Sequence, residues 1–457
     1  MRRFILTCAQ NNTPLHTEVW ENLLALRDYW GAEIGISRLS YSANAYLGAR
    51  KVGTGGVDAG DWWDPRIAPY ILDERVQLAP GLHWCGEINI SPTAVRPLSG
   101  FETYTGRASG IFPHPKVALE SIPAMRGEGA KINYTTGAIT KINLIQAKAG
   151  QKAAFHHVFG ALLVEVSTEG HWWCRQLNAE EGTWKIQDLD VVVENGKVIT
   201  GHKVEAIVWG DFHTDQMDPE MRRLLIPTLA KLRPKYQIVH DLLDFRSRNH
   251  HDFNDPHLNY QKHVEGIENV EEEIRRAASI LTMIDREGCK TIVVNSNHDG
   301  FFFRWLKDAD YRKDPANARY FLEAQLEVYR SLERGDANFH LVEWAIRHAG
   351  CPEGVRLLRQ DESFRVARGE VECGLHGDIG PNGQRGSPVN LSKLARKLMI
   401  AHGHYAWIRD QVYCVPTMSE LTMGYTKGPS NWSHGFGLVY PNAKRALISC
   451  WEGRAWA

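Results

Sequence analysis

The chain has 457 residues, of which 43% are hydrophobic and 23% charged, and its 53 lysines and arginines nearly balance 54 aspartates and glutamates. These shares are typical of soluble globular proteins and exclude a largely disordered chain, while the formal net charge of −1 argues against a polybasic nucleic-acid binder. The length predicts about two or three domains.

The cysteines and the apolar segments indicate a cytoplasmic protein. Eight cysteines are scattered along the chain without a C-x-x-C pair, and a chain this long needs no disulfides to bury a core, so we expect reduced thiols. The apolar run that begins at Phe4 stops at Thr7, which is too short for a signal peptide. No stretch approaches the roughly 18 apolar residues of a membrane-spanning helix, so we expect no membrane partner.

Residues 1–200 are predicted to form a smaller N-terminal α/β domain. A strand–helix–strand unit is expected over residues 4–36, with the helix capped by Thr17 and ended by Gly31. β structure is expected after residue 158, with a tight hairpin turn at Asn195-Gly196. No motif assigns a function to this domain, for which we expect a role in substrate engagement or oligomerisation.

Buried strands alternate with helices after residue 200, where we place the domain boundary. Strands are expected at 204–209, 236–240 and 291–294, and helices at 219–232 and 264–287. Each strand ends in polar and ionisable residues, which predicts a parallel or mixed sheet with an active site along one edge. The second domain would therefore cover residues 201–457, with a largely helical insertion at about 300–375.

Five short segments of this second domain share carboxylate, imidazole and amide side chains. They are Asp211-Phe212-His213, Asp241-Leu242-Leu243-Asp244, Asn297-His298-Asp299, His376-Gly377-Asp378 and His402-Gly403-His404. Such ligands suit Mn²⁺, Zn²⁺, Fe or Mg²⁺. In D-x-H or H-x-H on a strand, both flanking side chains point to the same side and can hold one ion. The segments therefore predict a metal centre.

In this order the segments resemble the signature of the calcineurin-like metallophosphoesterases, over residues 204–450. The resemblance implies a β-sandwich flanked by helices, and two divalent ions bridged by a hydroxide that attacks a phosphodiester. It implies a first ion held by Asp211, His213 and His404. It implies a second ion held by Asn297, His376 and His402, with Asp241 as the bridge. His298 would lie over the substrate as a catalytic residue, and Asp299 would orient its ring. Departures from the pattern, where glycine is usual, are His240, Ser296, Leu375 and Ala401.

Basic side chains beside the predicted centre are candidates for substrate binding. Arg246, Arg248 and His250 follow the second segment, and Lys427 lies in a Gly-Pro loop after the last. Arginine pairs bidentately with phosphate, so these residues could hold a polyanionic backbone. A solvated loop whose arginines pair with acidic neighbours, and a plain turn around Lys427, are the alternatives.

The whole arrangement is also similar to a phage branch, the early first-step-transfer DNases of T5-like phages. The likeness depends on residues 7–14 and 427–432 and on the helical insertion. It implies a Mn²⁺-dependent DNase that degrades DNA in the host cytoplasm. Two alternatives stay open, a small-molecule phosphoesterase for cyclic nucleotides or nucleotide derivatives, and a non-catalytic binding or assembly protein with a structural metal site. Because closed homo-oligomers are common, we expect a dimer or larger assembly.

Overall fold

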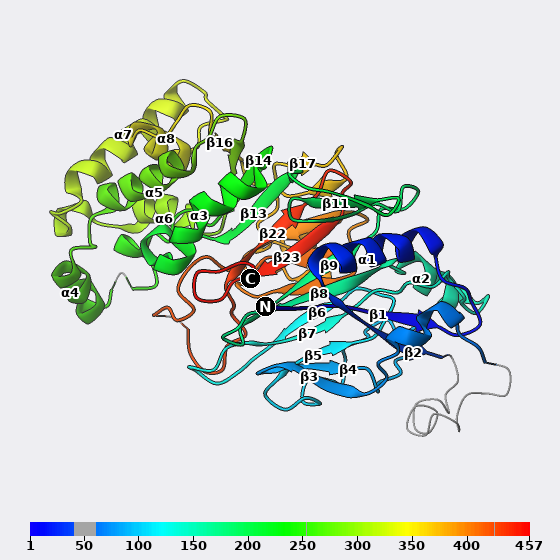
Figure 1. Ribbon diagram of the computed structural model, residues 1–457. Coiled ribbons are helices and arrows are strands. Elements are labelled where there is room, and N and C mark those ends of the chain that lie inside the picture. Colours follow the sequence, from blue (N-terminus) through cyan, green and yellow to red (C-terminus); the bar gives the residue numbers. More distant parts are fainter. Residues whose placement is uncertain (41–60, 253, 425) are drawn as a thin grey trace.

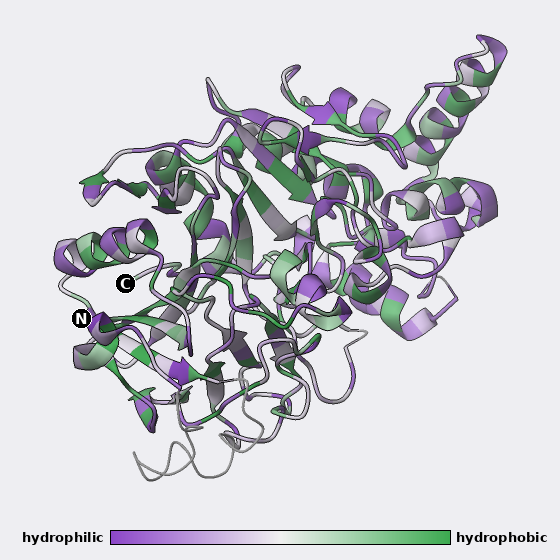
Figure 2. Cartoon of the chain, turned by 90° about the vertical axis from the view of Figure 1, so that its right-hand side faces the viewer, coloured by the Kyte–Doolittle hydropathy of each residue, from purple (hydrophilic) through white to green (hydrophobic). Residues whose placement is uncertain are grey.

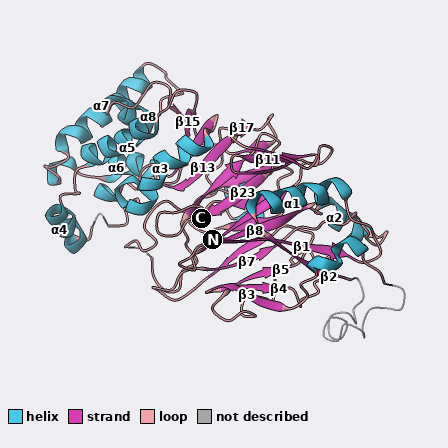
Figure 3. Ribbon diagram, viewed as in Figure 1, coloured by secondary structure: helices cyan, strands magenta, loops and turns pink. Residues whose placement is uncertain are grey.

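The protein has a mixed α/β fold, in which most helices gather on one side of the strands (Figures 1 and 3). The computed structural model describes residues 1–40, 61–252, 254–424 and 426–457. Within these residues the strands form four sheets of four, three, six and ten strands. No helix in the described ranges combines the length and apolar character needed to cross a membrane. The described cysteines are all buried, and none forms a disulfide.

The four-stranded sheet has the order β2-β1-β8-β9 and contains the predicted N-terminal unit. Its strands are β1 (Arg2–Gln10), β2 (Glu33–Leu39), β8 (Gly160–Val166) and β9 (Trp172–Asn178). Helix α1 (Thr17–Trp30) connects the parallel strands β1 and β2, and Gly31 ends it in the left-handed conformation, as predicted. His16 rather than Thr17 is the N-cap, and its side chain makes no capping hydrogen bond, so the capping prediction was wrong.

The predicted hairpin lies in the three-stranded sheet. It contains β10 (Ile186–Asp188), β11 (Val191–Glu194) and β12 (Lys197–Ile199). Asn195 and Gly196 connect β11 to β12 with φ of 51° and 69°, the positive angles that a two-residue hairpin turn requires. The hairpin prediction is confirmed.

The six-stranded sheet has the order β16-β15-β14-β13-β22-β23. Its strands are β13 (Ala206–Asp211), β14 (Tyr236–His240), β15 (Lys290–Val293), β16 (Arg356–Leu357), β22 (Gly435–Val439) and β23 (Arg445–Ser449). Strands β13 to β16 pair in parallel, whereas β22 pairs antiparallel with both β13 and β23. The sheet is therefore mixed, as expected.

Helices α3 to α8 belong to this part of the chain. They are α3 (Pro219–Leu232), α4 (Pro256–Glu265), α5 (Val270–Ile284), α6 (Asp299–Asp308), α7 (Ala318–Glu333) and α8 (Leu341–His348), with short 3₁₀ turns η3 (Thr214–Gln216), η4 (Arg246–Arg248) and η5 (Tyr311–Lys313). The single helix expected over 264–287 is wrong. Gly266 ends α4 in the left-handed conformation, and Asn269 caps α5 by accepting from the Glu272 N–H.

The ten-stranded sheet joins both parts of the chain. Its strands are β3 (Arg75–Ala79), β4 (Leu82–Cys85), β5 (Ser109–Phe112), β6 (Leu119–Ile122), β7 (Lys131–Thr135), β17 (Arg365–Val366), β18 (Val371–Glu372), β19 (Lys397–Ile400), β20 (Trp407–Arg409) and β21 (Val412–Cys414). Strand β20 pairs antiparallel with β6, with Ile408 opposite Leu119. Residues before and after 200 thus share one sheet, and a domain boundary there stays a prediction.

The remaining elements are short. They are η2 (Pro65–Tyr70), α2 (Lys148–Phe155), η6 (Pro381–Gly383) and α9 (Pro388–Leu391).

Both faces of the six-stranded sheet are buried, and mostly hydrophobic segments lie in the middle of the molecule (Figure 2). On β13, Ile207 and Trp209 pack among the helices, whereas Ala206 and Val208 pack among residues of the four- and ten-stranded sheets. This alternation is the period of two of a β-strand. The sheet is therefore held rigidly between two layers, and its strand ends can position side chains precisely.

Candidate metal centre

The predicted ligands come from strand ends that meet at one place. Asp211 is the last residue of β13, Asp241 follows β14, and Asn297 follows β15. Because these strands are parallel neighbours, their carboxyl ends lie at the same edge of the sheet. The ten-stranded sheet contributes His376 after β18 and the 402–404 segment after β19.

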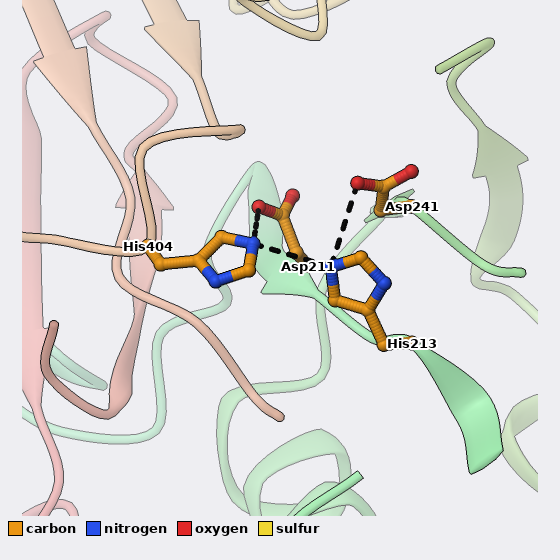
Figure 4. A group of neighbouring side chains, drawn as sticks. All are labelled: Asp211, His213, Asp241 and His404. Atoms are coloured by element: carbon orange, nitrogen blue, oxygen red, sulfur yellow. Dashed lines mark hydrogen bonds and ion pairs between the residues drawn. The ribbon is translucent and has the colours of Figure 1, made fainter. Parts of the chain in front are cut away.

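Four side chains form the tightest group, and their polar atoms point toward one another (Figure 4). His404 Nε2 lies 2.8 Å from Asp211 Oδ2 and 3.1 Å from His213 Nε2. His213 Nε2 is in turn 3.6 Å from Asp241 Oδ2. The candidate ligand atoms of the four all lie within 4.8 Å of one another, and all four residues are buried. A buried Asp/His set of this kind can hold a metal ion.

His376 approaches the same carboxylates from the ten-stranded sheet. Its Nε2 lies 3.3 Å from Asp241 Oδ2, and its Nδ1 lies 3.8 Å from Asp211 Oδ1. The ring of His402 is 5.1 Å from that of His376, and its backbone N–H donates to Asp211 Oδ1. The structure thus brings six of the seven predicted ligands into contact, with Asp241 between the two histidine groups, and the seventh, Asn297, lines a cavity together with His376. Their division between two ions stays a prediction.

Asp244 also lies in the centre, although no role was predicted for it from the sequence. Its Oδ1 lies 3.2 Å from His213 Nδ1 and 3.4 Å from His298 Nδ1, and the three residues form a second possible ligand group. The sequence did contain a signal for Asp244, because it is the last residue of the second polar segment, three residues after Asp241.

Asp299 does not make the contact that the resemblance implies. Its Oδ2 accepts hydrogen bonds from the Ser296 N–H (3.1 Å) and the Asn295 side-chain amide (3.0 Å). His298 Nδ1 lies instead 2.9 Å from the carbonyl oxygen of Asp244. Asp299 is the first residue of α6, and its carboxylate turns back to donors in the loop before the helix. The expectation that Asp299 orients His298 is therefore corrected in favour of Asp244.

Several buried atoms of the centre lack partners. Among the described residues, those without any hydrogen bond include Asp241 Oδ1, Asn297 Oδ1 and His404 Nδ1. A buried polar atom without a partner costs about 1–3 kcal/mol, so such atoms indicate a missing ligand. With a mixed nitrogen and oxygen donor set, the residues fit divalent metal ions.

The charges of the centre change the pKa values of its members. Burial would lower the pKa of His213, but the carboxylates of Asp241 and Asp244 outweigh it and raise that pKa to about 9. Burial also opposes the charge of His376, yet Asp241 and Asp211 raise its pKa to about 9. Both imidazoles are thus cations at pH 7 in the metal-free protein, and a metal ion must displace their protons to bind.

The loops of the centre have an unusual backbone. Positive φ angles occur at His213 (38°), Asp241 (44°), His402 (64°) and His404 (58°). This conformation costs about 1–2 kcal/mol for a residue with a Cβ atom. Neighbouring loops hold it in place, since the His213 N–H donates to the Asp241 carbonyl at 2.8 Å. Strain of this sort is common where side chains must be aimed at a functional site.

Comparison with curated proteins identifies a relative of this chain. The chain is 35% identical over 474 aligned residues to "Protein A1" of Escherichia phage T5, covering 100% of this chain and 83% of that protein. The chain belongs to the Protein A1 family. The alignment spans the whole chain, residues 1–200 included, and it supports the phage link. No protein-family model and no solved structure match the chain.

The predicted phosphate-binding arginines of this Protein A1 family member already have acidic partners. In η4, Arg248 makes two hydrogen bonds to the carboxylate of Asp314, at 2.6 and 2.7 Å. Arg246 Nη2 lies 3.3 Å from Glu265 Oε2. A phosphate would have to displace these carboxylates, so substrate binding by the two arginines stays a prediction.

His250 contacts the ring of Phe301, which in turn contacts His298 of the centre. Its ring lies 4.5 Å from that of Phe301, which in turn lies 4.6 Å from the ring of His298. Burial lowers the pKa of His250, so it is largely neutral at pH 7. Its role in substrate binding is not tested by these contacts.

Lys427 is exposed on the loop that also carries Trp432. The Trp432 ring packs on His404, at 4.1 Å between centroids, so this loop borders the metal centre. A role for Lys427 in substrate binding in the Protein A1 family stays a prediction.

Gly210 allows the close approach that positions Asp211. A Cβ atom at residue 210 would lie 1.6 Å from the carbonyl oxygen of Pro416, and the adjacent Thr417 hydroxyl donates to the Asp211 carbonyl. We expect Gly210→Ala to shift the end of β13, to destabilise the protein by about 1–3 kcal/mol, as overpacking does, and to weaken metal binding. Urea unfolding and metal titration would measure both effects. Gly354→Ala, where a Cβ has open space, is the matched control; equal behaviour of the two variants would contradict the prediction.

Proposed function

We propose that the chain is a dimetal phosphodiesterase of the calcineurin-like type, a nuclease that hydrolyses DNA with Mn²⁺ and acts in the host cytoplasm. The observation that carries the proposal is the buried cluster of Asp and His side chains where the parallel strands of the six-stranded sheet end. The phage relative and the order of the five polar segments support it. The proposal includes a phosphoesterase domain over residues 201–457. A homo-oligomer stays a prediction, which light scattering would test.

The residues of the centre would have different roles, which follow from their positions. The carboxylates of Asp211 and Asp241, with the imidazoles around them, would hold the ions. Bound divalent ions would lower the pKa of water to about 7 and neutralise charge on the phosphoryl oxygens. His298 lies beside this group, with its Nε2 4.0 Å from Asp241 Oδ2, and it is 9% exposed. From this position its ring would contact a bound phosphodiester and donate a proton to the leaving oxygen. Asp244 holds that ring in position.

The test is hydrolysis of plasmid and linear duplex DNA with added Mn²⁺, beside bis-p-nitrophenyl phosphate. Asp241→Asn is the inactive variant, and Asp28→Asn, with a side chain 67% exposed on α1, is the matched control. Degradation of DNA by the wild type and Asp28→Asn alone is the expected result. Cleavage of the small diester without DNA would overturn the nuclease and favour a small-molecule phosphoesterase. No hydrolysis of either, with fewer than two ions bound per chain, would favour the binding protein.

Metal binding should stabilise the fold, and more so at higher pH. Because the folded pKa values of His213 and His376 are raised, their charge stabilises the metal-free protein below about pH 6.5, and this contribution is lost as pH rises to about 9. Metal affinity changes in the opposite direction, because fewer protons must be displaced. We therefore expect Mn²⁺ to raise the unfolding temperature, by a stabilisation of about 2.7 kcal/mol at one hundred times Kd, with tighter binding at pH 8.5 than at pH 6.5. Differential scanning calorimetry with EDTA and with Mn²⁺ measures this; weaker binding at pH 8.5 would contradict it.

A further inference from the structure

Two cavities share one lining side chain, and the first of them borders the metal centre. The first, of about 310 Å³, includes the predicted ligands Asn297 and His376 in its wall. The second, of about 700 Å³, lies between α6, η5 and α7. Phe303 of α6 lines both cavities. Its side chain is 49% exposed, which is unusual for a phenylalanine so close to a buried cluster of charges.

One face of α6 leads from the first cavity to the second. Gly300, Phe303 and Lys307 are three and four residues apart, so they lie in one row on the helix. Gly300 lines the first cavity and Lys307 the second, with Phe303 between them. A Cβ at Gly300 would meet no atom within 4 Å, so this end of the row is open. The row therefore forms a track that starts at the metal centre.

The second cavity has aromatic side chains in its wall, together with basic side chains and two acidic ones, Asp308 and Asp310. Tyr329 and Tyr311 line this cavity with Lys307 and are 57% and 37% exposed, and the Tyr311 ring is also stacked on Phe321, at 5.6 Å between centroids. Arg312 also lines the cavity, but its guanidinium is paired with Asp310 at 2.7 Å. Exposed rings, more than free charge, thus distinguish this surface. Exposed rings next to a cationic side chain are typical of sites where unpaired bases stack.

We propose that this track, defined by Gly300, Phe303 and Lys307 with the two cavities, binds an unpaired strand of nucleic acid, one of whose bases stacks on Phe303. The inference rests on the proposed function and narrows its substrate class to single strands or locally opened duplex ends. The first cavity is near the lower limit of ligand pockets, about 300 Å³, which suits one nucleotide and not a duplex. Stacking on the neighbouring base pairs buries both faces of an internal base in a duplex, so such a base cannot stack on Phe303 until the duplex opens.

The test measures binding without hydrolysis. Fluorescein-labelled oligo(dT) is titrated against the wild-type protein, Phe303→Ala and Phe303→Trp in EDTA, by fluorescence anisotropy. We expect Phe303→Ala to raise Kd about tenfold, the loss of one base–aromatic stack, and Phe303→Trp to retain the wild-type Kd. Phe155→Ala is the matched control, because Phe155 is 74% exposed on α2 and lines neither cavity. A relaxed, covalently closed circular duplex, which has neither ends nor unpaired loops, should show no dependence on residue 303.

The possible outcomes separate this inference from the nuclease itself. Equal Kd values for the wild type and Phe303→Ala would overturn the track. Equal loss of affinity for oligo(dT) and the closed duplex would overturn its preference for single strands. Binding that depends on Phe303, in a protein that hydrolyses no DNA with Mn²⁺, would support the track and overturn the nuclease. Thermal unfolding and Mn²⁺ binding of each variant check that its fold is intact.

Discussion

Replacement of Asp241 by asparagine is expected to abolish metal binding and hydrolysis together. The Oδ2 atom of Asp241 lies within 3.3 Å of His376 Nε2, 3.6 Å of His213 Nε2 and 4.0 Å of His298 Nε2. No other carboxylate in the described residues has ion-pair contacts to three histidines of the centre. The substitution keeps the size of the side chain and removes its charge, so the loss would be electrostatic.

The expected loss of activity in Asp241→Asn is large. Removal of one group that stabilises charge in a transition state costs about 10²–10³ in rate, and Asp241 would act on both ions. Metal content measured by mass spectrometry and turnover of bis-p-nitrophenyl phosphate would report the two effects on the same sample. Asp28→Asn should retain both properties. If Asp241→Asn retained two ions per chain and wild-type turnover, the carboxylate would have no part in the centre.

A second large effect is expected far from the centre, at Arg175 in β9. Its guanidinium makes two hydrogen bonds to Asp188 of β10, at 2.7 and 2.9 Å, and a third to Glu165 of β8, at 2.6 Å. Arg3 of β1 binds the same Glu165 at 2.8 Å. Arg175 and both carboxylates are almost fully buried, so this network joins the four-stranded sheet to the three-stranded sheet.

We expect Arg175→Met to lower the free energy of unfolding by about 3–5 kcal/mol, because it leaves two buried carboxylates without their shared cation. Urea unfolding followed by tryptophan fluorescence measures this. Arg2→Met is the matched control: the Arg2–Glu33 pair is 3.9 Å apart with side chains 60% and 69% exposed, and its loss should cost at most about 1 kcal/mol. Similar losses in the two variants would show that the buried network is not stabilising.

Local signals allowed much of the fold near the centre to be predicted. Helix α3 has the expected bounds, because Asp218 accepts from the N–H groups of Glu220 and Met221 and Pro219 favours the first helical turn. Strand β14 also has the expected bounds, since a short apolar run ends there in charged residues. The polar segments at the strand ends likewise predicted that Asp211 and Asp241 would lie close together, because the carboxyl ends of neighbouring parallel strands meet at one edge of the sheet.

Contacts between distant residues could not be predicted in this way. Arg248 pairs with Asp314, 66 residues away, instead of with an acidic neighbour in its own loop. The partner of His298 is Asp244 rather than the adjacent Asp299, because the Asp299 carboxylate accepts a hydrogen bond from the Ser296 N–H instead. The pairing of β20 with β6 likewise has no local signal, since strand pairing depends on side chains brought together by the fold.

That strand pairing determines when the centre can form during synthesis. A ribosome releases the N-terminal part of a nascent chain first, so β6 is made long before β20 can pair with it. Until then the edge of β6 stays open, and open edges invite pairing with other chains. His402 and His404 also emerge only just before β20. An interrupted translation product would lack these two imidazoles, so the cluster of Asp and His side chains can be complete only when synthesis has passed residue 404.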